Sequence, residues 1–207
     1  MKDTSTKKPK GRPKKINSHL VEEVINDLPV EVIIDDEIEI PINENSSELE
    51  VSNFIGSFIK MTKSKTALEI GVFKGESSIK IIESLPNGGQ YVGIDLGDYR
   101  SKEVKDIMNQ GGKSIDFILG DSQTELRKLP KNHFDLIFVD GNHTWSYILN
   151  EFKIVENLVA KGGAIIYHDS IKIDDVSQLI KYAMQFKYKA VTLNTPDGHG
   201  ISILQKY

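Results

Sequence analysis

Two acids and a histidine follow apolar runs in the second half of the chain. Asp140 comes directly after the run 134–139, His143 lies three residues later, and Asp169 follows the run 163–168. Carboxylates are ligands of hard cations, and a histidine can take a proton near neutral pH. If the two runs are neighbouring strands, the three side chains predict a hard-cation site with a base beside it. The alternatives are that His143 caps a following helix and that Asp169 caps the following segment.

A glycine-punctuated turn follows an earlier apolar run, 67–70, and opens a predicted helix. The spacing of its glycines lets backbone approach a ligand closely, while the free N–H groups of the helix point at the same place. Neither the Gly-Lys-Ser/Thr ending of a P-loop nor the pattern G-x-G-x-x-G is present. The turn therefore predicts a nucleotide-type cradle. Its expected ligand-binding residues are Glu69, Gly71, Phe73, Gly75, Ser77 and Ser78.

Polar residues also end two further apolar runs. Asp95, followed by Leu96, lies 24 residues after Gly71, about the separation at which a carboxylate binds the ribose hydroxyls of a nucleoside. Asp121 and Ser122 follow the run 115–119, where they would contact the adenine edge. Capping of a helix is the alternative for both acids. His199, on a glycine-rich turn before the last run, is assigned no role.

The elements that must position these residues alternate along the chain from residue 66 onward. Near-continuous apolar runs indicate strands that are buried on both faces. We expect strands at 67–70, 91–95, 115–119, 134–140, 163–168, 190–193 and 201–204, and helices near 76–85, 101–110, 122–129, 144–160 and 174–187. Strict alternation predicts an α/β fold with a doubly wound, seven-stranded sheet. Ligands of such a sheet bind at the carboxyl ends of its strands.

The turn E-x-G-x-x-x-G-x-S resembles the first motif of class I S-adenosylmethionine-dependent methyltransferases. The runs FDLIFVDGNHTW and GGAIIYHDS resemble the methyltransferase family 24 group, and the likeness covers about residues 48–207. The resemblance implies a Rossmann-like sheet, S-adenosylmethionine as cofactor, and methyl transfer to a hydroxyl of a small molecule. It also implies that Asp140 and Asp169 hold Mg²⁺ and that Asp140 and His143 are catalytic, with Asp140 beside the cofactor. Where the sugar-modifying relatives have paired acids, this chain has His168-Asp169.

Length and composition fit one main domain with appendages. The chain has 207 residues, of which 39% are hydrophobic and 27% charged. We divide it into a basic tail at 1–16, an extension at 17–47 with a short helix and a strand pair, and a methyltransferase domain at 48–207. The sequence has no cysteine, no apolar run of membrane-spanning length and no secretory signal, so we expect a soluble cytoplasmic protein without a membrane partner. Residues 17–47 or a second subunit of a homo-oligomer would close the ligand pocket.

The charge is distributed unevenly. The net charge is −4, but residues 1–16 contribute +6, which leaves −10 for residues 17–207. The segment 7–15 resembles an AT-hook, which reads A·T-rich DNA through the minor groove; its core is Lys10, Gly11, Arg12, Pro13 and Lys14. A generic cationic arm is the alternative.

A second function hypothesis is a DNA-associated protein. Its methyltransferase fold would be a targeting partner or a degenerate cofactor-binding module. Asp140-Gly141-Asn142-His143 is not the Asn/Asp-Pro-Pro-Tyr/Phe motif of base amino-methyltransferases, which disfavours methylation of DNA bases.

Overall fold

The computed structural model of the chain describes residues 47–109 and 112–206. The strands are β1 (Thr66–Ile70), β2 (Gln90–Asp95), β3 (Ser114–Leu119), β4 (Phe134–Val139), β5 (Val159–Tyr167), β6 (Tyr188–Leu193) and β7 (Ile201–Lys206). The helices are α2 (Ser47–Thr62), α3 (Glu76–Ser84), α4 (Lys102–Met108), α5 (Ser122–Glu125), α6 (Trp145–Leu158) and α7 (Asp174–Ala183), with a 3₁₀ turn at Leu126–Lys128. Every strand and helix expected from residue 66 onward is confirmed, although the helix expected at 122–129 ends in the 3₁₀ turn. The basic tail at 1–16, and the short helix and strand pair expected within 17–47, lie outside the described residues.

The strands form one seven-stranded sheet with the order β3-β2-β1-β4-β5-β7-β6. The strands β3, β2, β1, β4 and β5 are parallel, whereas β7 runs antiparallel to both of its neighbours, β5 and β6. The predicted doubly wound sheet is confirmed. The chain order reverses between β1 and β4, so the topological switch point, where ligands bind in such sheets, lies at the carboxyl ends of these two strands.

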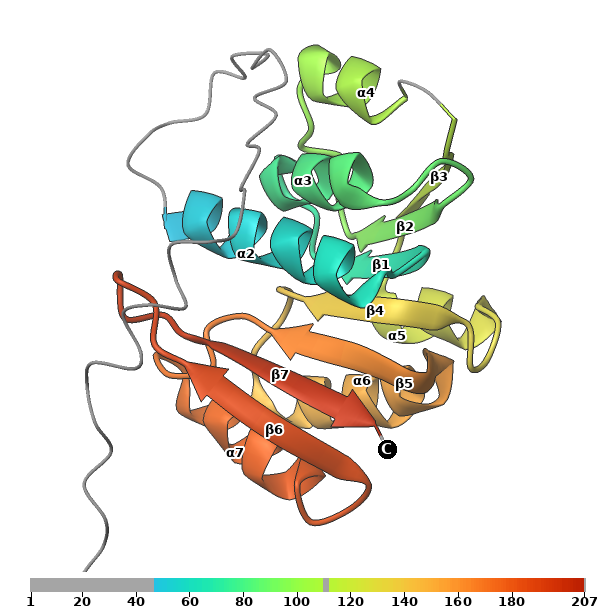
Figure 1. Cartoon of the computed structure of the whole chain (residues 1–207). Helices are drawn as coiled ribbons and strands as arrows, with labels where there is room; N and C mark the ends of the chain where they lie inside the picture. The colour runs from blue at the N-terminus through green and yellow to red at the C-terminus, as the bar shows by residue number, and fades with distance from the viewer. Residues whose placement is uncertain (1–46, 110–111, 207) are drawn as a thin grey trace, which may run out of the picture. The chain divides into compact units, whose positions relative to one another are not determined.

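Helices cover both faces of the sheet. Figure 1 shows α2, α3 and α4 on one face and α5, α6 and α7 on the other. The two layers explain why the central strands are apolar throughout, as at Leu68, Ile137 and Ile165, which have no exposed surface. Trp145 is partly buried against the same core. None of the helices in the described part of the chain is long and apolar enough to cross a membrane.

Candidate functional site

Two glycines let the loop after β1 pass close to its neighbours. Gly71 has φ 85°, and a Cβ there would lie 2.1 Å from the carbonyl oxygen of Asp140, at the end of β4. Gly75 has φ 87° and precedes α3; a Cβ there would lie 2.8 Å from Cγ1 of Val104. Left-handed backbone and close contact both require glycine. Gly71 therefore allows close packing of β1 and β4 at the switch point, and Gly75 allows close packing of the start of α3 against α4.

Glu69 is the buried anchor of this loop. Its carboxylate is fully buried and accepts hydrogen bonds from the hydroxyl groups of Ser77, Ser78 and Tyr91. Burial raises the pKa of Glu69 to about 7, against the opposing effect of these hydrogen bonds. Neither Glu69 nor Ser78 lines the two cavities described below. Glu69 and Ser78 connect the first turn of α3 to β1 and β2. They therefore contribute to the predicted cradle by positioning α3 and not by lining a cavity.

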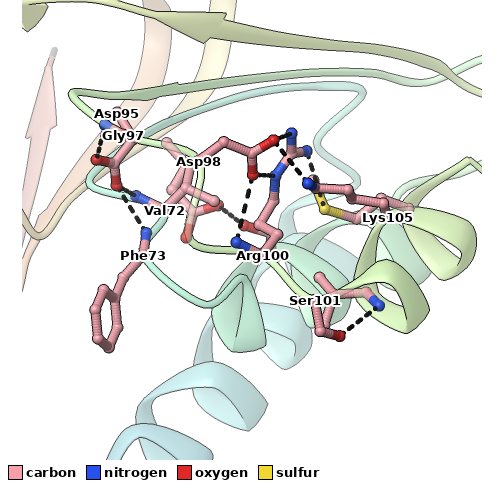
Figure 2. Close-up of polar contacts among 12 residues, drawn as sticks. Val72, Phe73, Asp95, Gly97, Asp98, Arg100, Ser101 and Lys105 are labelled. Carbon is pink, nitrogen blue, oxygen red and sulfur yellow. Dashed lines mark hydrogen bonds and ion pairs between the residues drawn. The ribbon is translucent and has the colours of Figure 1, made fainter.

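The carboxylate of Asp95 closes the same loop from the end of β2. Figure 2 shows it facing the backbone amides of the loop: Oδ2 accepts from Val72 N at 2.8 Å and from Phe73 N at 2.7 Å, and Oδ1 accepts from Gly97 N at 3.1 Å. The alternative that Asp95 caps a helix is wrong, because Ser101 caps α4. A carboxylate has about four acceptor positions, so Asp95 retains acceptor capacity for a ligand.

An ion-paired cluster fixes the chain after β2. Asp98 pairs with Arg100 at 2.9 Å and with Lys105 at 2.9 Å, as Figure 2 shows. The guanidinium of Arg100 also lies 3.4 Å from the ring centre of Phe117 on β3. These contacts hold the segment that leads from Asp95 to α4, beside the loop that Asp95 closes.

Two cavities meet at Gly71, Phe73 and Asp140. One, of about 250 Å³, lies along the ends of β2 and β3, where its lining includes Asp95, Leu96, Asp121 and Ser122. The other, of about 200 Å³, reaches α2, where its lining includes Val51, Ser52, Lys74, Gly75, Ser77 and His168. The structure thus brings all but two of the residues predicted for the cradle to the walls of adjoining cavities.

Asp121 and Ser122 combine a structural role with a place on the cavity wall. Asp121 caps α5 by accepting from Thr124 N at 3.0 Å, and it also accepts from the Tyr147 hydroxyl at 2.8 Å. Ser122 donates to the buried carboxylate of Glu151. Burial raises the pKa of Glu151 to about 7. The predicted capping alternative is thus what Asp121 does, and the contact with a ligand stays a prediction.

The three residues of the predicted reaction centre lie together. His143 Nε2 is 3.6 Å from Asp140 Oδ1 and 3.3 Å from Asp169 Oδ2. Burial alone would raise the pKa of Asp140, but hydrogen bonds from His143 and His168 outweigh it and hold that pKa at about 2. The N-cap of α6 is Thr144, so His143 does not cap this helix. Its ring instead faces both carboxylates.

Two more histidines complete this cluster, and the sequence interpretation missed their part in it. His168 Nδ1 lies 3.1 Å from Asp140 Oδ1, and His199 Nδ1 lies 2.6 Å from Asp169 Oδ1. The rings of His168 and His199 stack with centroids 5.7 Å apart. The sequence pattern assigns His199 no role, but the structure places it in this cluster. Because β7 is antiparallel, the β6–β7 loop turns at the carboxyl edge of the sheet and brings His199 to Asp169.

The family model described as O-methyltransferase matches residues 25–194. The chain belongs to the O-methyltransferase family. Caffeoyl-CoA O-methyltransferase of Pinus taeda is 28% identical over 166 residues, which cover 74% of this chain and 63% of the relative. The corresponding enzyme of Medicago sativa is 26% identical over 191 residues, with coverage of 80% and 76%. The chain thus spans less than two thirds of the length of the pine relative.

Solved O-methyltransferases share the fold of this family member. TomG of Streptomyces achromogenes, in complex with S-adenosylmethionine, superimposes with a TM-score of 0.60 at 16% identity, over 76% of this chain and 79% of TomG. The O-methyltransferase of Bacillus cereus, in complex with S-adenosylhomocysteine, gives 0.60 at 16% identity, over 76% and 81%. The Rossmann-like fold that the sequence predicted is confirmed.

Proposed function

We propose that this member of the O-methyltransferase family transfers a methyl group from S-adenosylmethionine to a hydroxyl of a small molecule. The observation that carries the proposal is the position of Asp140, which lies on the walls of both cavities and next to His143. A cofactor that extends through both cavities and an acceptor near the histidines would therefore meet at this residue. The family and the S-adenosylmethionine complex of TomG support the choice of cofactor.

The chain has groups of the right kind to hold this cofactor. Asp95 would accept hydrogen bonds from the ribose hydroxyls with its remaining acceptor positions. Leu96 and Phe73 are exposed apolar side chains on the same cavity wall, where they would pack against the adenine ring. Gly71, Gly75 and Ser77 lie along the second cavity and would contact the amino-acid part. Asp121 and Ser122 would lie at the adenine edge.

The protein must position the acceptor and receive one proton. When bound, S-adenosylmethionine supplies a methyl group on a sulfonium: the S–C bond breaks as the C–O bond forms in line with it. In the neutral ring, Nε2 of His143 donates toward Asp140 and Asp169, at 3.6 Å and 3.3 Å, so the lone pair lies on Nδ1, which has no hydrogen-bond partner among the described residues. We assign the proton of the acceptor hydroxyl to this Nδ1. The two carboxylates beside Nε2 would stabilise the imidazolium that forms.

The Mg²⁺ that the family resemblance implies does not fit these surroundings. Mg²⁺ takes oxygen ligands in near-octahedral geometry. Asp140 faces His143 and His168, and Asp169 faces His143 and His199, so the carboxylates share their cluster with imidazole nitrogens. We assign no step of the reaction to Mg²⁺.

The test measures cofactor binding and methyl transfer separately. We expect calorimetry to give a micromolar dissociation constant for S-adenosylmethionine, about −8 kcal/mol. Transfer is followed as S-adenosylhomocysteine formed with caffeoyl-CoA, the acceptor in the name of the pine relative, and with free catechols. His143→Gln should lower turnover by about 10²–10⁴ and leave cofactor affinity unchanged, since it removes only the base.

His133→Gln is the matched control for this variant, because His133 lies at the amino end of β4, away from the cavities, and contacts Gln90 at 2.7 Å. It should keep full turnover. Absence of cofactor binding by the wild type would overturn the proposal. Full turnover of His143→Gln would remove the assigned base.

The charge distribution supports a separate contact with DNA through residues 7–15, which lie outside the described residues. Seven Lys/Arg side chains in residues 1–16 would neutralise about seven phosphates, so log K for duplex DNA should fall with log salt at a slope near −6. Deletion of residues 1–16 should abolish binding. Preference for A·T-rich duplex would distinguish an AT-hook from a generic cationic arm, and equal binding by the truncated protein would exclude both.

A further inference from the structure

Three of the five histidines of the chain lie in one cluster with two aspartates. Asp140 and His143 come from the end of β4, and His168 and Asp169 from the end of β5. His199 comes from the β6–β7 loop. Four separate carboxylate–imidazole contacts, of 2.6 to 3.6 Å, connect the five side chains. A single base needs one imidazole, so the proposed methyl transfer gives no role to His168 and His199.

The hydrogen bond between His168 and Asp140 fixes the tautomer of His168. Nδ1 of His168 lies 3.1 Å from Asp140 Oδ1, and a carboxylate oxygen accepts, so Nδ1 carries the proton of this hydrogen bond. In the neutral ring the lone pair then lies on Nε2. His168 is 5% exposed, and its Nε2 has no hydrogen-bond partner among the residues that the structure describes. A metal-ligating histidine has this arrangement, with its other nitrogen donating to a carboxylate.

Asp169 and His199 offer further ligand atoms beside His168. One ligand atom each from His168, Asp169 and His199 lie within 4.8 Å of one another. Asp169 has φ 55°, an uncommon conformation for a residue other than glycine. The backbone holds it there: Ile173 N donates to the Asp169 carbonyl, and Ser170 N donates to that of Gly200. The bond from Ser170, together with those from Ile171 N and Lys172 N to the His199 carbonyl, connects the segment after β5 to the loop that carries His199.

We propose that His168, Asp169 and His199 bind a divalent transition-metal ion of the Fe²⁺, Co²⁺, Ni²⁺ and Zn²⁺ class, in place of the Mg²⁺ that the family resemblance implies. Imidazole nitrogen suits these borderline ions, whereas Mg²⁺ is held by oxygen. Two imidazoles and one carboxylate leave positions open on the ion. Asp140 then orients His168 rather than binding the ion, and His143 remains available as the base.

Lys172 gives this proposal a second consequence. Its ammonium lies 2.7 Å from His199 Nε2 and donates to it, which puts the proton of the neutral ring on Nδ1. An ion bound at Nδ1 moves that proton to Nε2, so the ammonium can no longer donate there. Lys172 is exposed and can turn toward the solvent. Removal of this competing cation by Lys172→Met should therefore tighten metal binding.

The experiment measures the bound ion directly, without a methyl acceptor. Full-length protein without a polyhistidine tag is stripped with EDTA, dialysed against Co²⁺ or Zn²⁺, and analysed for metal content, for the visible absorption of Co²⁺ and by calorimetry. We expect one equivalent of ion that a hundredfold excess of Mg²⁺ does not displace. His168→Ala and His199→Ala should each weaken binding more than about 100-fold. Asp140→Asn, which changes only an orienting group, should weaken it by about 10–100-fold.

His133→Ala is the matched control, because it removes a histidine outside the cluster; it should bind the ion like the wild type. Displacement of Co²⁺ by an equal concentration of Mg²⁺, or unchanged binding by both His168→Ala and His199→Ala, overturns the proposal. Circular dichroism would show if a variant fails to fold. In that case the metal content of the wild type and its competition with Mg²⁺ still decide whether the protein has a transition-metal site.

This inference concerns the site of the proposed methyl transfer, and the two can fail separately. Calorimetry with S-adenosylmethionine on the same samples distinguishes them. Cofactor binding without metal binding overturns only the metal site. Metal binding without cofactor binding overturns only the proposed function.

Discussion

The buried carboxyl of Glu69 should make the stability of the fold depend on pH. Its pKa is about 7 in the folded protein, against 4.5 for an exposed glutamate. At this residue the folded state therefore binds more protons than the unfolded state between these values, so the stability contributed by Glu69 is highest at low pH and falls as the pH rises toward 7. Integration from pH 5 to pH 8 gives a loss of about 2.5 kcal/mol from this one group.

Glu69→Gln isolates this contribution, because glutamine has nearly the same shape and does not ionise. Urea unfolding at pH 5, 6, 7 and 8 gives the free energy of unfolding of both proteins. The substitution also disturbs the hydrogen bonds from Ser77, Ser78 and Tyr91, but that cost is nearly the same at each pH. Relative to the variant, the wild type should lose about 2.5 kcal/mol between pH 5 and pH 8.

Glu151→Gln serves as a comparison, since burial also raises the pKa of Glu151 to about 7 and Glu151 lies on helix α6, whereas Glu69 lies on strand β1. The pH-dependent loss of stability that comes from Glu151 should still be present in the Glu69→Gln variant. A difference between wild type and Glu69→Gln that stays constant from pH 5 to pH 8 would refute the reasoning, because Glu69 would then ionise alike in the folded and unfolded states.

Two further predictions concern the loop after β1. Asp95→Ala should weaken S-adenosylmethionine binding at least about tenfold in calorimetry, since it removes the charged acceptor for the ribose and frees the amides of Val72 and Phe73; unchanged affinity would count against the ribose contact. Gly71→Ala should lower the free energy of unfolding by at least about 2 kcal/mol, because its Cβ would lie 2.1 Å from the Asp140 carbonyl oxygen; a variant as stable as the wild type in urea would contradict the close packing of β1 and β4.

The sequence predicts the fold well because strands that are buried on both faces are apolar at nearly every position. Runs such as 134–139 are apolar without interruption, and glycine marks the turn that leaves β1. The approach of Asp140, His143 and Asp169 also follows from the sequence, since parallel strands that neighbour each other end at the same edge.

The places of His168, His199 and Glu69 depend on features that local pattern does not contain. His199 reaches Asp169 only because β7 enters the sheet between β5 and β6, an arrangement set by packing rather than by any motif. Glu69 lies within an apolar run, where the sequence alone suggests a polar residue at the end of a strand. Its burial depends on Tyr91 of the neighbouring strand, whose hydroxyl fits where Gly93 has no side chain: a Cβ there would lie 2.6 Å from it.

The last strand of the chain, β7, lies between β5 and β6, and this position determines the order in which the sheet can be completed during synthesis. During synthesis β6 leaves the ribosome before β7, yet within the described chain its only strand neighbour is β7. His199 is made just before that strand and is held near Asp169 through the backbone pairing of the 199–200 segment with residues 170–172. A nascent chain therefore lacks both the seated β6 and the complete histidine cluster until the last strand is in place. Assembly of the site is coupled to completion of the sheet. A chain released before β7 is made would have neither a seated β6 nor the complete histidine cluster.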